Sequence, residues 1–149
     1  WLRVAVVVAG IALLLQAGRD MLELHPYEYV YFNRLSGGLA KNHTRYETDY
    51  WGASYREGLR WVLDERPGLR RGRRLHVAGC DSNANKRLTY YVRQWADAKW
   101  HLKIVDTYDQ AEIFLAVQRF NCADVPGTIL HEVRRQGAPL LYVKRTVPR

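Results

Sequence analysis

The chain has 149 residues, of which 48% are hydrophobic and 26% are charged, close to the mix of an average globular protein. This composition excludes a disordered tail, a collagen-like fibre and a low-complexity array. Lysine and arginine number 23 against 15 aspartate and glutamate residues. The resulting formal charge of +8 favours a partner that carries phosphate groups, either a nucleic acid or a lipid surface. Two cysteines are too few for a disulfide scaffold.

The first segment of the chain is strongly apolar. Residues 4–15 form an unbroken apolar run, and Arg3 and Gln16 are the polar residues within 1–18. A membrane-spanning helix needs roughly 20 apolar residues, so residues 1–19 are predicted to form a transmembrane helix. A signal peptide and a buried core helix are the alternatives, although no Met begins the run and it has no polar face. Because the sequence begins with Trp, we expect this helix to be the last span of a longer protein.

Residues 20–48 are predicted to form an aromatic-rich juxtamembrane segment. Pro26 disfavours helix at the residue before it, and residues 27–33 alternate partly in polarity. This stretch is therefore expected to be extended, or to be a short helix that begins at Pro26.

Residues 49–149 have the pattern of a small α/β domain. Asp49 is a helix-capping residue, and the apolar stripe after it predicts an amphipathic helix over residues 50–65. The Pro-Gly pair at 67–68 ends this helix.

A strand–helix–strand pattern follows. It comprises a strand at 75–79, a helix capped by Asn83 or Asn85, and a strand at 102–105. This order predicts a parallel βαβ unit with a right-handed crossover. A third, mostly buried strand is predicted over 112–120.

The last part of the chain is predicted to be a β-hairpin. Residues 128–134 alternate in polarity, Gln136 and Gly137 supply the turn, and residues 139–143 return as a strand. The fold class is therefore α/β: a transmembrane helix followed by a small mixed sheet with one βαβ unit and a C-terminal hairpin.

The chain offers few signals for catalysis. The sequence has no dinucleotide-binding, P-loop or nucleophile-elbow motif. No histidine has metal-ligand spacing to another histidine or cysteine, so neither a metal nor a cofactor is expected. The turn at 79–83 follows a strand and precedes a helix, where open α/β sheets bind ligands, but an ordinary polar turn is the simpler interpretation. Cys80 and Cys122 follow the first and third strands, so they lie close enough for a disulfide if those strands are neighbours, and otherwise they are free thiols.

A basic cluster follows the first amphipathic helix. It contains Arg66 and four further arginines, which are candidates for contact with lipid phosphate: Arg70, Arg71, Arg73 and Arg74. A solvated loop is the alternative. Because the cluster has no interleaved aromatic residues and matches no recognition module, nucleic acid is not an expected partner.

Half of the aromatic residues lie in one quarter of the chain. Nine of the eighteen fall between positions 25 and 61, directly after the apolar helix. Tyr and Trp favour the boundary between water and lipid, so core packing and interface anchoring explain much of this set. The accompanying polar groups could also hold a sugar or a lipid-linked phosphate. The candidate binding residues are His25, Tyr27, Tyr29, Asn33, Glu47, Asp49, Tyr50 and Trp51.

Three motifs in this region carry a family resemblance. Residues 25–33 (HPYEYVYFN), 46–52 (YETDYWG) and 54–57 (SYRE) resemble the C-terminal region of bacterial multi-spanning glycosyltransferases of the GT-C type. These proteins include the protein O-mannosyltransferase-like and lipid A sugar transferase-like enzymes. The ending at 139–145 (PLLYVKR) is similar to how such chains end. The resemblance covers residues 20 to 145.

The resemblance implies a role for the chain in a larger membrane enzyme. It would be the C-terminal accessory domain of a glycosyltransferase that uses a polyprenyl-phosphate-linked sugar. The α/β domain would lie on the extracytoplasmic (periplasmic) side of the inner membrane. Its partners would be membrane lipid, the upstream transmembrane domain and the lipid-linked sugar. The catalytic loop of such enzymes lies near their N-terminus and has no counterpart here, so no catalytic residue is assigned. The alternative is a single-pass, membrane-anchored binding or scaffold domain.

Overall fold

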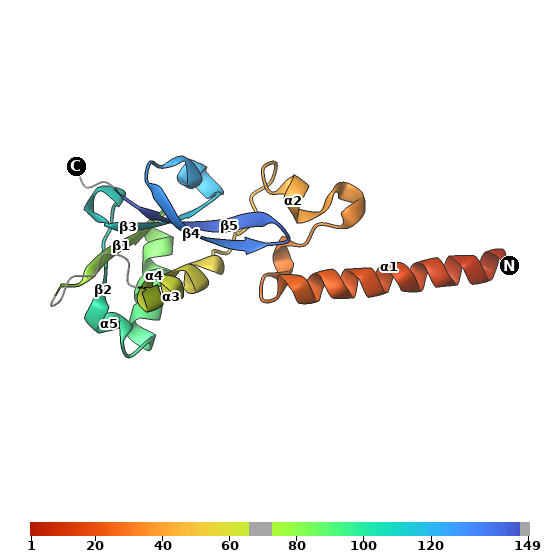
Figure 1. Ribbon diagram of the computed structural model, residues 1–149, viewed down its shortest axis with the longest axis horizontal. Coiled ribbons are helices and arrows are strands. Elements are labelled where there is room, and N and C mark those ends of the chain that lie inside the picture. The colour runs from red at the N-terminus through yellow and green to blue at the C-terminus, as the bar shows by residue number, and fades with distance from the viewer. Residues whose placement is uncertain (66–72, 147–149) are drawn as a thin grey trace. The chain divides into compact units, whose positions relative to one another are not determined.

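The computed structural model describes residues 1–65 and 73–146, and the chain forms two compact units. Unit 1 comprises residues 1–46 together with 135–138, and unit 2 comprises the remainder of the chain. The α/β fold class is confirmed: unit 2 contains a five-stranded mixed sheet, and an apolar helix begins unit 1 (Figure 1).

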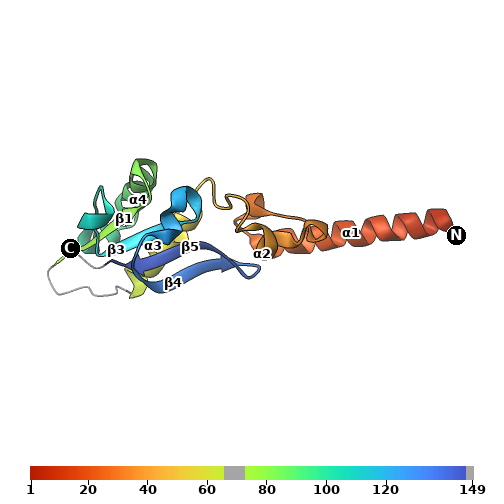
Figure 2. The same cartoon turned by 90° about the horizontal axis from the view of Figure 1, so that it is seen from above.

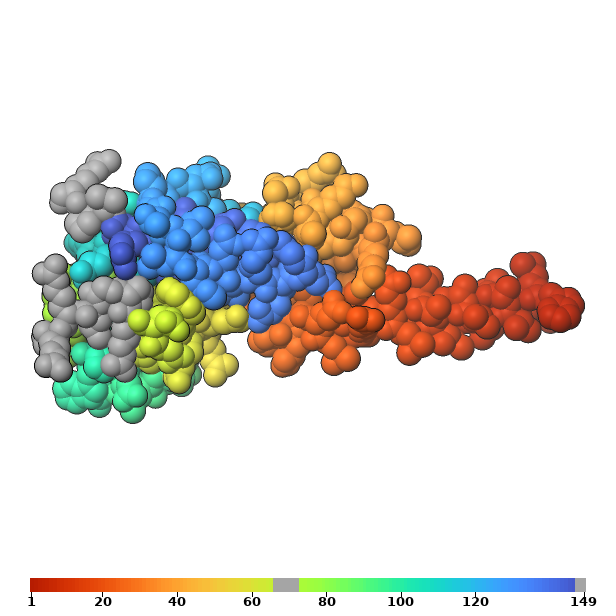
Figure 3. All heavy atoms as spheres, viewed as in Figure 1, coloured from red at the N-terminus to blue at the C-terminus, as the bar shows by residue number. Residues whose placement is uncertain are grey.

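The apolar helix of unit 1, α1 (Leu2–Leu24), has 23 residues and so is about 35 Å long, enough to cross a hydrocarbon core of about 30 Å. Most of its apolar side chains are exposed, and Leu14 is 74% exposed. Figure 3 shows the atoms of this helix uncovered along most of its length on the face that is drawn. Among the described residues, α1 is the helix that is long and apolar enough to span a membrane. It extends five residues beyond the predicted end at residue 19, where Arg19 pairs with Glu23 at 3.0 Å.

The rest of unit 1 is built from short helical turns. They are η1 (Glu28–Val30), η2 (Arg34–Ser36) and α2 (Gly38–Asn42). The segment that follows Pro26 is thus a single 3-10 turn, rather than a strand. Asp20 on α1 is 2% exposed and forms an ion pair with Arg34 at 2.6 Å, which ties η2 to α1. The buried carboxylate of Asp20 therefore has a charged partner, which a buried charge requires.

The sheet of unit 2 has the strand order β2-β1-β3-β5-β4. The neighbouring strands β4 and β5 at one edge can be followed in Figure 2. The strands are β1 (Leu75–Gly79), β2 (Leu102–Ile104), β3 (Ile113–Val117), β4 (Thr128–Arg135) and β5 (Ala138–Arg145). β1 pairs in parallel with β2 and with β3, and β3 pairs antiparallel with β5. The predicted βαβ unit and C-terminal hairpin are both present. The hairpin turn has positive φ at Gln136 and Gly137, as a two-residue type I′ turn requires.

Three helices accompany the sheet: α3 (Ser54–Glu65), α4 (Ser82–Gln94) and the short α5 (Ala98–His101). α3 and α4 lie on the same side of the sheet (Figure 1). A Cβ added to Gly58 of α3 would lie 2.6 Å from Leu141 of β5, so the glycine permits a close approach of helix and sheet. The buried faces of both helices therefore form the main core with the inward side chains of β1, β3 and β5.

The opposite face of the sheet carries a second apolar cluster. It contains Ala78, Phe114 and Ala116 from the strands, and Val105 and Cys122 from connecting segments. Because both faces are covered, all five residues of β3 are buried and its sequence is continuously apolar. β3 ends at Val117, three residues before the predicted end, and the chain continues into the 3-10 segment η4 (Arg119–Asp124).

The cap of α4 differs from the prediction. Asp81, and not Asn83 or Asn85, is the N-cap: its carboxylate accepts a hydrogen bond from the N–H of Ala84 at 2.7 Å. Asn85 instead accepts from the N–H of Gly79 at 2.7 Å and donates to the carbonyl of Asp106 at 2.9 Å. Asn85 thus joins the helix to the end of β1, a role that its position in the sequence does not reveal.

Candidate functional site

The carboxyl ends of β1 and β3 lie side by side and form a candidate site in unit 2. Gly79 of β1 is in register with Leu115 of β3. β2, which follows β1 in the sequence, lies on the other side of β1 from β3. The connection that leaves β1 therefore runs toward β2, whereas the one that leaves β3 runs toward β4 on the other side, which is the topological switch point where open α/β sheets bind ligands.

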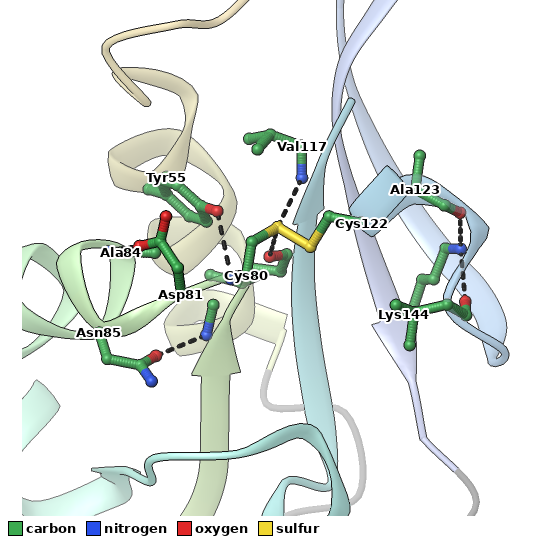
Figure 4. The surroundings of a disulfide bond; sticks show 12 residues. Tyr55, Cys80, Asp81, Ala84, Asn85, Val117, Cys122, Ala123 and Lys144 are labelled. Atoms are coloured by element: carbon green, nitrogen blue, oxygen red, sulfur yellow. Dashed lines mark hydrogen bonds between the residues drawn. A yellow bond between two sulfur atoms is a disulfide. The ribbon is translucent and has the colours of Figure 1, made fainter. Parts of the chain in front are cut away.

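A disulfide between Cys80 and Cys122 lies at this edge of the sheet (Figure 4). The Cα atoms of the two residues are 5.8 Å apart, within the range that disulfides require. The cysteines are close because β1 and β3 are neighbours. Lys144 of β5 adds a second connection: its Nζ donates to the carbonyl oxygens of Ala123 and, at 2.9 Å, Val125. Both interactions hold η4 against the sheet.

A pocket of about 60 Å³ opens at the switch point. It is lined by Asp49, Tyr50, Tyr55, Cys80, Asp81, Asn83, Ala84, Arg87, Val117, Arg119 and Phe120. These residues come from the segment before α3 and the first turn of α3, from the β1–α4 turn and α4 itself, and from the end of β3 and the start of η4.

The two carboxylates of the pocket are bound to helix N-termini. Asp49 is 4% exposed and accepts hydrogen bonds from the N–H groups of Ala53 at 2.9 Å and Ser54 at 3.0 Å, and from the Ser54 hydroxyl. Asp81 caps α4. The predicted capping role of Asp49 is confirmed, and its carboxylate orients the start of α3 at the pocket wall.

Arg119 is the central cation at the mouth of the pocket. Its guanidinium lies 4.2 Å from the ring centre of Tyr50 and 4.3 Å from that of Phe120. Its Nε atom is buried and lies 3.3 Å from a Glu47 carboxylate oxygen, an ion pair whose geometry falls short of a hydrogen bond. The Trp51 ring meets the Tyr50 ring edge-on at 5.2 Å. Glu47, Tyr50, Trp51, Arg119 and Phe120 therefore form one contiguous cluster.

The backbone at Phe120 and Asn121 is in the left-handed region, with φ of 57° and 54°. Bulky residues seldom adopt this conformation, which costs of order 1 kcal/mol each. The Phe120 side chain is nevertheless exposed, at 62%. The disulfide at Cys122 and the Lys144 interactions hold this turn in place.

Tyr55 forms the floor of the pocket. Its side chain is 3% exposed, and its hydroxyl oxygen accepts a hydrogen bond from the N–H of Cys80 at 3.3 Å. Burial is the main cause that raises the pKa of Tyr55, with smaller contributions from the negative charges of Asp81 and Asp49. The phenol is therefore neutral at physiological pH and has a hydrogen to donate.

The eight predicted binding residues fall into two sets. Glu47, Asp49, Tyr50 and Trp51 belong to unit 2, at or beside the pocket. The other four belong to unit 1: His25, Tyr27, Tyr29 and Asn33.

Three of the unit 1 residues make local contacts within that unit, and the fourth, Tyr29, is 42% exposed. Tyr27 is 2% exposed with Arg135 over its ring at 4.6 Å, and the Asn33 side chain accepts from the N–H of Ser36 at 2.8 Å. His25 lies 2.5 Å from the Glu28 carboxylate. Hydrogen bonding to its own backbone N–H, followed by that to His25, lowers the pKa of Glu28.

The arginines predicted to contact lipid fall partly outside the described residues, as Arg70 and Arg71 do. Arg73 and Arg74 are exposed, and Arg73 pairs with Glu112 at 3.3 Å. Of the two described arginines, Arg73 is therefore engaged in an ion pair within the domain.

The sequence did not reveal Tyr55, Arg87, Arg119 or Phe120 as site residues. Tyr55 lies within the apolar stripe that predicts the helix over residues 50–65, and its side chain is 3% exposed. Ligand-binding residues of open α/β sheets often follow the end of a buried strand. The predicted strand over 112–120 includes Arg119 and Phe120, whereas β3 ends at Val117, so the prediction hid both residues.

The arrangement offers hydrogen-bonding groups and aromatic surface rather than a metal site. Residues 1–65 and 73–146 contain no group of three or more His, Cys, Asp or Glu side chains that could hold a metal ion. Comparisons with protein-family models, curated proteins and solved structures gave no match.

Proposed function

We propose that the chain is a membrane-anchored accessory domain of a multi-spanning glycosyltransferase that uses a polyprenyl-phosphate-linked sugar, with unit 2 on the extracytoplasmic side of the inner membrane. The observation that carries the proposal is the combination of an exposed, apolar 23-residue helix with a disulfide in the α/β unit that follows it. A disulfide persists in oxidising compartments and is rare in the cytosol. The motifs at residues 25–33 and 46–52 supply the resemblance to this enzyme class.

The role is accessory rather than catalytic. The pocket carboxylates Asp49 and Asp81 are engaged as helix caps, because each accepts a hydrogen bond from a backbone N–H group at the start of a helix. The pocket at the switch point gives unit 2 a place to bind the substrate or acceptor of such an enzyme.

A tagged native gene product tests the proposal. We expect a C-terminal alkaline phosphatase fusion to be active in cells, and thiol trapping to find Cys80 and Cys122 oxidised. We also expect the product purified from native membranes to transfer sugar from a polyprenyl-phosphate donor, and the isolated 149-residue chain to transfer none. An inactive fusion with reduced cysteines, or a purified product without transferase activity, would contradict the proposal.

A single-pass anchored binding domain is the second candidate. It is favoured by the length of α1, which suffices to span a membrane by itself, and by the presence of a pocket that needs no upstream residues. An extracytoplasmic, oxidised product that lacks transferase activity would support this candidate over the first.

A further inference from the structure

An exposed aromatic rim borders the pocket at the switch point, and we propose that the pocket and rim together bind a neutral sugar residue of a glycan. The rim consists of Tyr50, Trp51 and Phe120, which are 48%, 64% and 62% exposed. Apolar side chains of this size are usually buried, and a cluster of them on the surface marks an interaction site. The left-handed backbone at Phe120 is a cost that the fold bears while it presents this ring to solvent.

The charges of the site favour a neutral ligand over a phosphate. The guanidinium groups of Arg87 and Arg119 are matched by the carboxylates of Asp49 and Asp81, and Glu47 pairs with Arg119 at 3.3 Å. The site thus has two positive groups against three negative ones, and such a set does not attract an anion. The chain as a whole nevertheless carries a charge of +8. The basic composition and the chemistry of this site therefore point to different partners.

The polar groups suit the hydroxyls of a sugar. The Tyr55 hydroxyl is buried, neutral and able to donate, and Asn83 presents an amide with both donors and an acceptor. The guanidinium of Arg87 adds a planar set of donors that can meet two neighbouring hydroxyl oxygens. These groups bind without requiring charge on the ligand.

The aromatic rim suits the apolar face of a sugar ring. The C–H groups on one face of a pyranose carry partial positive charge and are attracted to the negative face of an aromatic ring. The Trp51 and Tyr50 rings meet edge-on, with their ring centres 5.2 Å apart. The hollow of about 60 Å³ is too small for a whole hexose ring. The ring would therefore lie over the rim while one hydroxyl-bearing edge enters the pocket.

This inference deepens the proposed function and rests on it for the identity of the glycan as substrate or acceptor. The binding chemistry itself depends on the site alone. A lipid bilayer is the competing occupant for exposed Tyr and Trp side chains, and a phosphate group is the competitor for the two arginines.

Saturation-transfer NMR on the full chain in phosphatidylcholine nanodiscs tests the inference. The probes are the methyl glycosides of mannose, glucose, galactose and N-acetylglucosamine, each at up to about 50 mM. We expect at least one glycoside to bind, and Trp51→Ala to weaken its affinity by about fivefold or more. Trp100→Ala is the matched control, because Trp100 is 65% exposed and belongs neither to the pocket lining nor to the aromatic rim, so it is expected to leave the affinity unchanged.

A second variant guards against a loss of binding through unfolding. Phe120→Gly removes the ring while it relieves the left-handed strain, so we expect a domain at least as stable as the wild type with about fivefold or more weaker glycoside binding. An unchanged affinity in both Trp51→Ala and Phe120→Gly would overturn the inference, as would the absence of binding for all four glycosides.

Two further measurements address the competing occupants. If inorganic phosphate binds at Arg87 and Arg119 while no glycoside does, the site is an anion site. If brominated lipid quenches the emission that Trp51→Phe removes, the rim contacts the bilayer instead. A cytoplasmic domain that binds a glycoside contradicts only the proposed function, and an extracytoplasmic domain that binds none contradicts only this inference.

Discussion

Loss of the Cys80–Cys122 disulfide should destabilise unit 2 by a large and calculable amount. The bond joins residues 42 positions apart. Closing a loop of about that length removes chain entropy from the unfolded state worth about 4 kcal/mol at 25 °C. We therefore expect Cys80→Ala/Cys122→Ala to lower the free energy of unfolding by about 4 kcal/mol, a large part of the 5–15 kcal/mol typical of a domain.

Urea unfolding of the chain in detergent micelles, followed by tryptophan fluorescence, measures this change. Wild-type protein treated with reductant is the control, because it breaks the bond and keeps both side chains; it should lose about the same stability. The double variant should not respond to reductant. The reasoning would be refuted if the double variant unfolded within about 1 kcal/mol of the oxidised wild type, or if the untreated protein showed two reactive thiols after denaturation.

Three further substitutions test the interior of unit 2. Asp49→Ala removes the carboxylate that accepts hydrogen bonds from the N–H groups of Ala53 and Ser54 at the start of α3. It should lower the free energy of unfolding, measured in urea, by about 1–2 kcal/mol. Gly58→Ala should cost about 1–3 kcal/mol in the same assay, because its Cβ would lie 2.6 Å from Leu141. Burial raises the pKa of Tyr55, so the unfolded state releases this proton first and stability falls as pH rises above about 10; Tyr55→Phe should make that fall less steep.

Matched variants separate these effects from general damage. Asp64→Ala changes an exposed aspartate near the end of α3 and should move the unfolding free energy by less than about 0.5 kcal/mol. Gly18→Ala introduces a methyl group with nothing within 4 Å and should be tolerated. Tyr90→Phe, at an exposed position, should leave the alkaline slope unchanged. Equal effects in a variant and its control would contradict the corresponding prediction.

The regular elements of this protein could be predicted from local sequence patterns. The apolar helix α1, the strands β1 and β2 with α4 between them, and the β4–β5 hairpin all follow from periodicity and turn residues. Element ends were less predictable, since α1 runs on to Leu24 and β3 stops at Val117. Ends depend on caps and packing partners that lie elsewhere in the chain.

The candidate site could be predicted only in part. The stretch from Glu47 to Trp51 is contiguous, and its mix of aromatic and acidic residues is visible in the sequence. Arg87 and Arg119 come from distant segments, and nothing local distinguishes them from the other arginines of the chain. Asp49 was a candidate both as a helix cap and as a binding residue, and its hydrogen bonds to the N–H groups of α3 show the first role.

Hydrophobic length and periodicity are local properties, so an apolar helix able to cross a membrane, followed by an α/β unit, can be predicted from the sequence alone. Strand order is not local. In the folded protein β1 lies between β2 and β3, and this arrangement brings Cys80 to Cys122. The packing of the segment before α3 brings Tyr50 to Arg119. The pocket lies where the connections that leave β1 and β3 run to opposite sides. The packing of both sheet faces sets this arrangement, and no single motif encodes it.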